Sequence, residues 1–121
     1  MARSSAGESV TFRVVRVLSS FDVDRPLLSV SEIARRAELP VATAHRIVGE
    51  LVQHRLLERR GTSVTVGVRL WEIASRGSHT LTLREAARPF MEDLHAAVRE
   101  HIQLGVLDGD EVLYLERLSA P

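Results

Sequence analysis

Apolar and polar positions alternate with the period of an α-helix in two adjacent segments between residues 28 and 60. The first segment opens on a capping box, Ser29 with Glu32 three residues later, in which each side chain can satisfy a backbone N–H of the opening turn. This spacing predicts a short helix over residues 30–38. Pro40 cannot continue that helix but suits the first position of another. We therefore expect two short helices joined by a tight turn.

The second helix is predicted to bury one apolar stripe and to expose a small, polar face. The inward stripe is Ala44, Ile47, Val48, Leu51 and Val52, and the outward face is Val41, Ala42, Thr43, His45, Arg46 and Glu50. Such a face can approach the floor of a major groove, and Arg46 can reach a guanine edge or a phosphate. We interpret it as the recognition helix of a helix-turn-helix. The predicted DNA contacts on the two helices are Ser29, Arg36, Val41, Ala42, Thr43, His45 and Arg46.

Beyond this helix the period changes to that of a β-hairpin carrying arginines. Two β-prone runs, 57–60 and 64–66, flank the polar turn 61–63. Behind a recognition helix this hairpin is typical of a wing, with Arg59, Arg60 and Thr62 placed to contact the phosphate backbone or a minor groove. Leu27 and Leu28 are candidates for a third, very short strand, and residues 8–21 for a leading helix that closes the core. Together these elements predict a winged helix-turn-helix domain over residues 8–67.

A short helix is predicted directly after the wing, from Val68 to Arg76, within a linker over residues 68–80. It carries the only tryptophan, Trp71. We expect its apolar face to pack on the leading helix of its own domain or, alternatively, on a second subunit. A dimer is favoured because a single small head rarely reaches the affinity of a specific regulator.

The remainder, residues 81–121, is predicted to be a long helix and a hairpin. Thr82 and Glu85 form a second capping box, and Pro89 predicts a kink or a break in the helix that follows. Two apolar runs then flank the turn at 108–110. A two-stranded ribbon is not stable alone, so we expect this part to be the truncated start of a larger α/β effector-binding domain. The overall fold class is α+β.

Charge is divided unevenly although the 121 residues have no net formal charge. Residues 1–80 hold twelve arginines against eight acidic residues, and residues 81–121 hold four against eight. This asymmetry matches a DNA-binding head followed by a different module. The chain has no cysteine, which excludes disulfides and thiolate metal sites. It also shows no apolar run of membrane-spanning length and no signal core, so a cytoplasmic location is expected.

Two other classes of function are also compatible with these patterns. Paired amphipathic helices occur in domains that never meet nucleic acid, and a winged helix can serve as a protein-interaction module without DNA binding. An enzyme would need a group such as Glu92, Asp93, His95 and His101, which on a solvent-facing helix is more typical of a polar surface. We therefore predict no catalytic residues, no metal site and no cofactor.

Three motifs in order resemble the isocitrate lyase regulator (IclR) family of bacterial transcription factors: LPVATAHRI, LREAARPFMEDL and DGDEVLY. The resemblance covers nearly the whole chain. It implies binding of operator DNA as a homodimer or dimer of dimers, and control by a small metabolite bound to a C-terminal domain that is mostly absent here. It places Thr43, His45 and Arg46 at the DNA, with residues 59–62 as the wing. Many members have lysine and serine where this chain has Val41 and Ala42, so its affinity or sequence preference is expected to differ.

Overall fold

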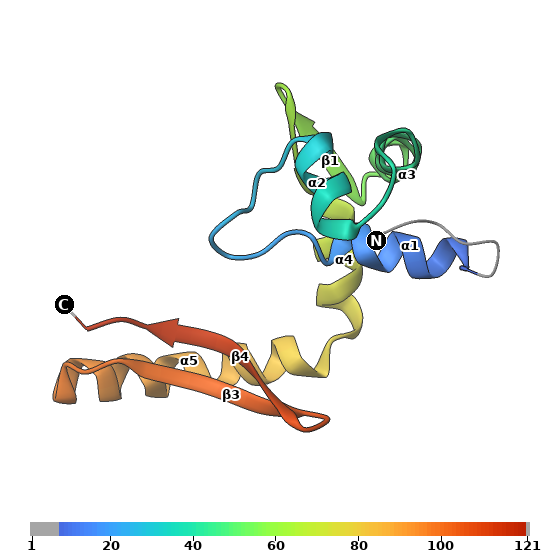
Figure 1. Cartoon of the computed structure of the whole chain (residues 1–121). Helices are drawn as coiled ribbons and strands as arrows, with labels where there is room; N and C mark the ends of the chain where they lie inside the picture. The colour runs from blue at the N-terminus through green and yellow to red at the C-terminus, as the bar shows by residue number, and fades with distance from the viewer. Residues whose placement is uncertain (1–7, 121) are drawn as a thin grey trace. The chain divides into compact units, whose positions relative to one another are not determined.

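The computed structural model describes residues 8–120, which fall into two compact units divided between Ile73 and Ala74 (Figure 1). The first unit holds three helices, a small hairpin and the start of a fourth helix, which continues into the second unit. The second holds a long helix and a longer hairpin. Both helical and sheet elements are present, so the α+β fold class is confirmed.

Helix α1 (Val10–Leu18) is shorter than the predicted span of 8–21. Two serines set its ends. The Ser9 side chain accepts a hydrogen bond from the backbone N–H of Phe12 and caps the start. At the other end Ser19 is the C-cap, and its N–H donates to the carbonyl of Val15 at 2.8 Å.

Helix α2 (Val30–Ala37) begins at the predicted capping box. The Ser29 hydroxyl accepts from the N–H of Glu32, and the Glu32 carboxylate accepts from the N–H of Ser29. The helix ends where Glu38 adopts a left-handed conformation with φ 57°. The N–H of Leu39 then donates to the carbonyl of Ala34 at 2.9 Å, which closes the tight turn.

Helix α3 (Val41–Gln53) follows at once and starts one residue later than predicted, because Pro40 is the N-cap and not the first helical residue. The inward stripe is confirmed at Ala44, Ile47, Val48 and Leu51, which are all buried, while Val52 is partly buried against the same cluster. The resulting core also draws on Val17 of α1 and on Leu28, Ile33, Leu57 and Val64. Burial of these side chains holds the three helices together.

The predicted wing is formed by β1 (Leu57–Arg60) and β2 (Ser63–Val66), which pair antiparallel. The predicted third strand is a single bridge: Leu28 and Val64 exchange two backbone hydrogen bonds of 3.0 and 2.7 Å. Both side chains are fully buried. The wing is therefore attached to the segment that leads into α2.

The chain leaves the wing through a very close backbone approach at Gly67. Its N–H donates to the carbonyl of Leu56 at 2.8 Å, and a Cβ at this position would lie 2.2 Å from the carbonyl oxygen of Arg55. Arg55 itself has a positive φ of 62°. No side chain fits between these two backbone segments, so position 67 requires glycine.

Helix α4 (Val68–Gly77) matches the predicted linker helix and includes the division between the two units. None of its residues is buried, and Trp71 is 64% exposed. On α1 the side chains of Val10, Phe12 and Val15 are about half exposed as well. Since these side chains are half or more exposed, the expected packing of the Trp71 face on the leading helix is at most partial.

In the second unit, α5 (His79–Val98) starts earlier than predicted. The prediction of a capping box at Thr82 is wrong, because the Ser78 side chain caps the helix by accepting from the N–H of Leu81 at 2.9 Å. Thr82 lies inside the first turns, where its hydroxyl donates back to the carbonyl of Ser78. The helix also runs through Pro89 without a break into two pieces.

The hairpin of β3 (Ile102–Asp108) and β4 (Glu111–Leu118) turns at Gly109, which has φ 65°. A glycine with positive φ at the first position of a two-residue loop is favoured in tight hairpins. The hairpin is fixed to α5 by Glu116, whose carboxylate accepts from Arg84 at 2.9 Å and Arg88 at 2.7 Å. These charge-assisted bonds join helix and ribbon within this unit.

Candidate nucleic-acid interface

The outer face of α3 presents the side chains expected to contact DNA. Val41, Ala42, His45 and Arg46 are exposed, and Thr43 is half-buried at the edge of the core. The first two are small or apolar, which leaves room for close approach, while His45 and Arg46 bring hydrogen-bond donors. The helix therefore carries a compact surface at its outer side, which we call the α3 face: Val41, Ala42, Thr43, His45 and Arg46.

Arg46 is held only loosely by its neighbour. Its Nη1 lies 3.7 Å from a carboxylate oxygen of Glu50, one turn along the helix, and the two side chains are 54% and 64% exposed. An exposed ion pair at this spacing contributes only about 0.3–0.5 kcal/mol. The guanidinium can therefore leave Glu50 for a base edge or a phosphate at little cost.

The start of α3 is open to an anionic partner. Pro40 makes no side-chain capping hydrogen bond, and the helical ladder begins with the N–H of Ala44 donating to the carbonyl of Pro40 at 3.0 Å. The N–H groups of residues 41–43 precede that bond, at the positive end of the helix dipole. Such groups bind phosphate oxygens well.

The wing places positive charge beside a tight turn. Gly61 has φ 61° at the first position of the two-residue loop, and Thr62, Arg59 and Arg60 are exposed. Arg60 Nε lies 3.2 Å from the Glu58 carboxylate, but that arginine remains 68% exposed. The wing therefore offers two exposed guanidinium groups and one hydroxyl to a phosphate backbone.

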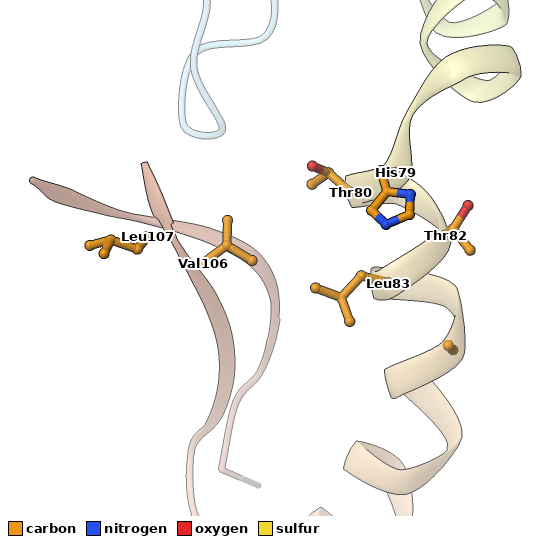
Figure 2. Close-up of a pocket in the computed structure, with 7 residues that line it drawn as sticks. His79, Thr80, Thr82, Leu83, Val106 and Leu107 are labelled. Carbon is orange, nitrogen blue, oxygen red and sulfur yellow. The ribbon is translucent and has the colours of Figure 1, made fainter. Parts of the chain in front are cut away.

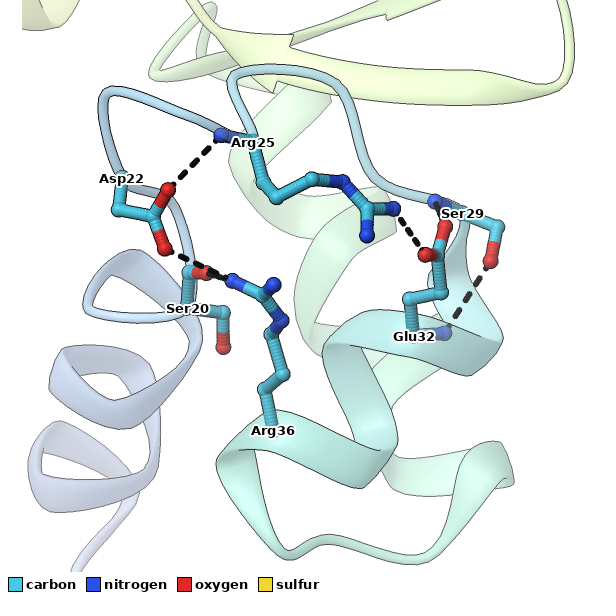
Figure 3. Close-up of polar contacts among 6 residues, drawn as sticks. All are labelled: Ser20, Asp22, Arg25, Ser29, Glu32 and Arg36. Atoms are coloured by element: carbon cyan, nitrogen blue, oxygen red, sulfur yellow. Dashed lines mark hydrogen bonds and ion pairs between the residues drawn. The ribbon is translucent and has the colours of Figure 1, made fainter.

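Ser29 and Arg36 both have partners within the head (Figure 3). Arg36 Nη1 donates to the carbonyl of Ser20 at 2.8 Å and to the Asp22 carboxylate at 3.1 Å, which fixes the loop between α1 and α2. In this structure the Arg36 side chain therefore has a structural role. The Ser29 side-chain oxygen accepts a hydrogen bond from the backbone N–H of Glu32. The hydrogen of the same hydroxyl can still be donated to a phosphate.

Glu32 lies at the centre of this cluster and makes it sensitive to acid. The N–H of Ser29, which donates to the carboxylate, and the neighbouring Arg25 guanidinium lower the pKa of Glu32 to about 2. Because the folded pKa lies below the ordinary value of 4.5, the stabilisation is complete above about pH 5 and is lost as the pH falls toward 2.

We expect Glu32→Gln to flatten this part of the acid dependence. Glutamine preserves the capping box but cannot be protonated, so the melting temperature of the variant should fall less than that of the wild type between pH 5 and 2. Thermal unfolding followed by circular dichroism at several pH values measures the difference. Parallel curves for the two proteins would contradict the assignment.

One arginine that matters for this surface was not predicted from the sequence. Arg16 of α1 donates through Nε to the carbonyl of Ala37 at 2.8 Å and through Nη2 to the carbonyl of Glu38 at 2.9 Å. Both carbonyls belong to the turn before α3. No local pattern marks this contact, because the two carbonyls lie more than twenty residues from Arg16 in the chain.

The second unit has a separate hollow between the start of α5 and the end of β3, with a volume of about 540 Å³ (Figure 2). Its lining is mainly apolar, with one imidazole and two hydroxyl groups: His79, Thr80, Thr82, Leu83, Ala86, Val106 and Leu107. Among the residues that the structure describes, no acid, lysine or arginine lines it. The hollow therefore lacks the paired charged groups typical of a catalytic site.

Within residues 8–120, no helix is both long enough and apolar enough to span a membrane, and no three potential metal-ligating side chains gather at one place.

Two family models match the chain. Residues 10–61 match the IclR helix-turn-helix domain, and residues 76–121 match the C-terminal part of the bacterial transcriptional regulator IclR. The first match ends at the turn of the wing and includes the whole α3 face. The second covers α5 and the β3–β4 hairpin.

A solved structure of an IclR homolog from Microbacterium hydrocarbonoxydans, complexed with 4-hydroxybenzoate, is 54% identical to the chain. Its TM-score is 0.84, and the match covers 93% of this chain and 47% of that one. The HTH-type transcriptional regulator KipR of Bacillus subtilis is 30% identical over 96 residues, which is 78% of this chain and 38% of KipR. The probable transcriptional regulator SauR of Cupriavidus necator is 32% identical over 123 residues, 96% of this chain and 46% of SauR. The chain thus spans less than half the length of these relatives.

Proposed function

Since this chain belongs to the IclR family of bacterial transcriptional regulators, we propose that it is the part of such a regulator that binds operator DNA. The observation that supports this most is the exposed α3 face within the region matched by the IclR helix-turn-helix domain. The protein would act in the cytoplasm, where the DNA is, as a binding protein and not as an enzyme.

In the proposed complex α3 lies in a major groove. Arg46 reads a base edge or holds a phosphate, and Thr43 and His45 make shorter contacts. The open N–H groups at the start of α3 and the hydroxyl of Ser29 contact the phosphate backbone. Arg59, Arg60 and Thr62 of the wing contact the flanking phosphates or minor groove. We propose a structural role for Arg36 in place of a DNA contact, because its guanidinium already binds the Ser20 carbonyl and the Asp22 carboxylate.

The proposal divides the chain by role into a reading head over residues 8–67, a connecting segment over 68–80 and the start of an effector-binding domain from residue 81. Two copies of the head would bind two half-sites, which requires a homodimer or a dimer of dimers. For a longer protein that carries this segment, we propose control by a small metabolite. The relative solved with 4-hydroxybenzoate makes an aromatic acid the first class to test.

A gel-shift titration on the promoter region adjoining the gene tests DNA binding directly. We expect binding at least about 10³-fold tighter than on random duplex of equal length, with affinity that falls steeply as salt rises. The titration should be repeated at several salt concentrations, because the contribution of phosphate contacts appears as the slope. Equal affinity for promoter and random duplex would contradict specific regulation by this chain.

The role of the wing predicts a change in salt dependence. Replacing Arg59 and Arg60 with alanine together should weaken binding to all duplexes and reduce the slope of log K against log salt by about 2, one for each phosphate that is no longer neutralised. Arg117→Ala, on an exposed position of β4, removes the same type of charge and serves as the control. An unchanged slope in the double variant would show that the wing does not touch phosphates.

A further inference from the structure

The turn between α2 and α3 is held from outside by one side chain of α1. The Arg16 guanidinium spreads three of its donors over three partners: Nε and Nη2 bind the carbonyls of Ala37 and Glu38, and Nη1 donates to the Glu8 carboxylate at 2.6 Å. The side chain is only 23% exposed. Its guanidinium carbon lies 5.4 Å from the centre of the Phe12 ring, a cation–π distance.

These contacts lie at the place that sets the direction of α3. The backbone hydrogen bonds of the turn use the carbonyls of Ala34 and Arg35, which accept from Leu39 and Glu38. Arg16 binds the carbonyls of Ala37 and Glu38, which come next in the turn. Only Leu39 and Pro40 then separate Glu38 from the first residue of α3. The orientation of the last peptide groups of α2 therefore determines where the α3 face points.

The chemistry of this contact depends on the shape of the guanidinium. Its planar fork can bind two neighbouring carbonyls and a carboxylate at once, whereas the ammonium of lysine is a compact charge on a flexible stem. Charge-assisted hydrogen bonds to the carbonyls at the end of α2 also complement the negative end of that helix. A substitution that keeps the charge but removes the fork should release the turn.

The geometry points to Arg16 as a positioning residue for DNA reading: it fixes the α2–α3 turn so that Thr43, His45 and Arg46 meet the bases in one orientation. This inference rests on the proposed function for its effect on DNA, but the contact itself is independent of DNA. In the proposed complex Arg16 does not touch the duplex. It acts through the peptide groups of Ala37 and Glu38.

Arg16→Lys tests the inference, because charge is kept and the fork is removed. We expect the ratio of promoter to random-duplex affinity to fall about tenfold, comparable to one mismatched base pair, with the salt slope unchanged. Val17→Ala is the matched control. It weakens the buried core from the same helix, and at a temperature where both proteins are folded it should keep the wild-type ratio. An unchanged ratio in Arg16→Lys, or an equal fall in Val17→Ala, would overturn the inference.

Amide hydrogen exchange without DNA provides a second, independent measurement. In Arg16→Lys the N–H groups of Glu38 and Leu39 should exchange about tenfold faster, while amides in the middle of α3 stay protected. Val17→Ala should not single out these two amides. If the wild type does not distinguish promoter from random duplex, the proposed function fails. Amide hydrogen exchange alone then tests whether Arg16 fixes the α2–α3 turn. Exchange at Glu38 and Leu39 that matches the wild type would then reject it.

Discussion

Replacing Arg46 with alanine is expected to weaken promoter binding by about 1–3 kcal/mol, because the only long, flexible cation on the α3 face is removed. The loss of affinity, compared between duplexes of different sequence, shows whether Arg46 contacts a base or a phosphate. If Arg46 reads a base, the effect will be confined to duplexes that carry that base. If it holds a phosphate, all duplexes will weaken evenly and the salt slope will fall by about 1. Fluorescence anisotropy on promoter variants measures both quantities.

Two controls make the Arg46 result specific. The exposed Arg46–Glu50 pair contributes little to folding, so thermal stability should change by less than about 0.5 kcal/mol in Arg46→Ala. Glu50→Gln removes the partner and a negative charge while keeping Arg46, and it should bind promoter as well as the wild type or better. Unchanged DNA affinity in Arg46→Ala would favour a winged helix that serves another role.

Replacing Gly67 with alanine is expected to destabilise the first unit by about 3 kcal/mol. The added Cβ would lie 2.2 Å from the carbonyl oxygen of Arg55, and this neighbour is backbone that cannot rotate away. Relief requires moving either the end of α3 or the exit of the wing, and the hydrogen bond from Gly67 to Leu56 would break. For a unit of this size the melting temperature should fall by more than about 10 °C.

Gly49→Ala is the matched control for Gly67. It lies inside α3, and a Cβ there meets nothing within 4 Å. The same chemical change should therefore stabilise the helix by about 0.5–1 kcal/mol. Urea unfolding of both variants measures whether each substitution raises or lowers the free energy of unfolding. A Gly67→Ala protein as stable as the wild type would show that the two backbone segments can separate freely.

Local signals in the sequence predicted much of this head. The Ser29–Glu32 capping box located the start of α2, the apolar spacing identified the buried side of α3, and the change of period located the wing. Each of these features is determined by residues within one turn of helix or one hairpin, so a single sequence is sufficient to find it. The exposure of the α3 face follows from the same spacing.

Local signals could not predict features that depend on a choice between two possible helix caps or on contacts between residues distant in the chain. Ser78 and Thr82 are both acceptable caps, and the structure uses Ser78 because a helix can extend one more turn before Thr82. Arg16 binds carbonyls of another helix, and Gly67 is required by the backbone at Arg55. The spacing of apolar residues contains no information on such contacts, since they exist only after the helices have packed.

Because of the bridge between Leu28 and Val64, the wing cannot be replaced as an independent hairpin. Its second strand is completed by a residue that precedes the helix-turn-helix, and both bridge side chains are fully buried. Trimming the hairpin would uncover Leu28 next to the cap of α2, and grafting a foreign hairpin would require a new fit at Val64. Engineering of altered promoter preference is therefore better confined to the solvent side of α3 and to the loop at residues 61–62.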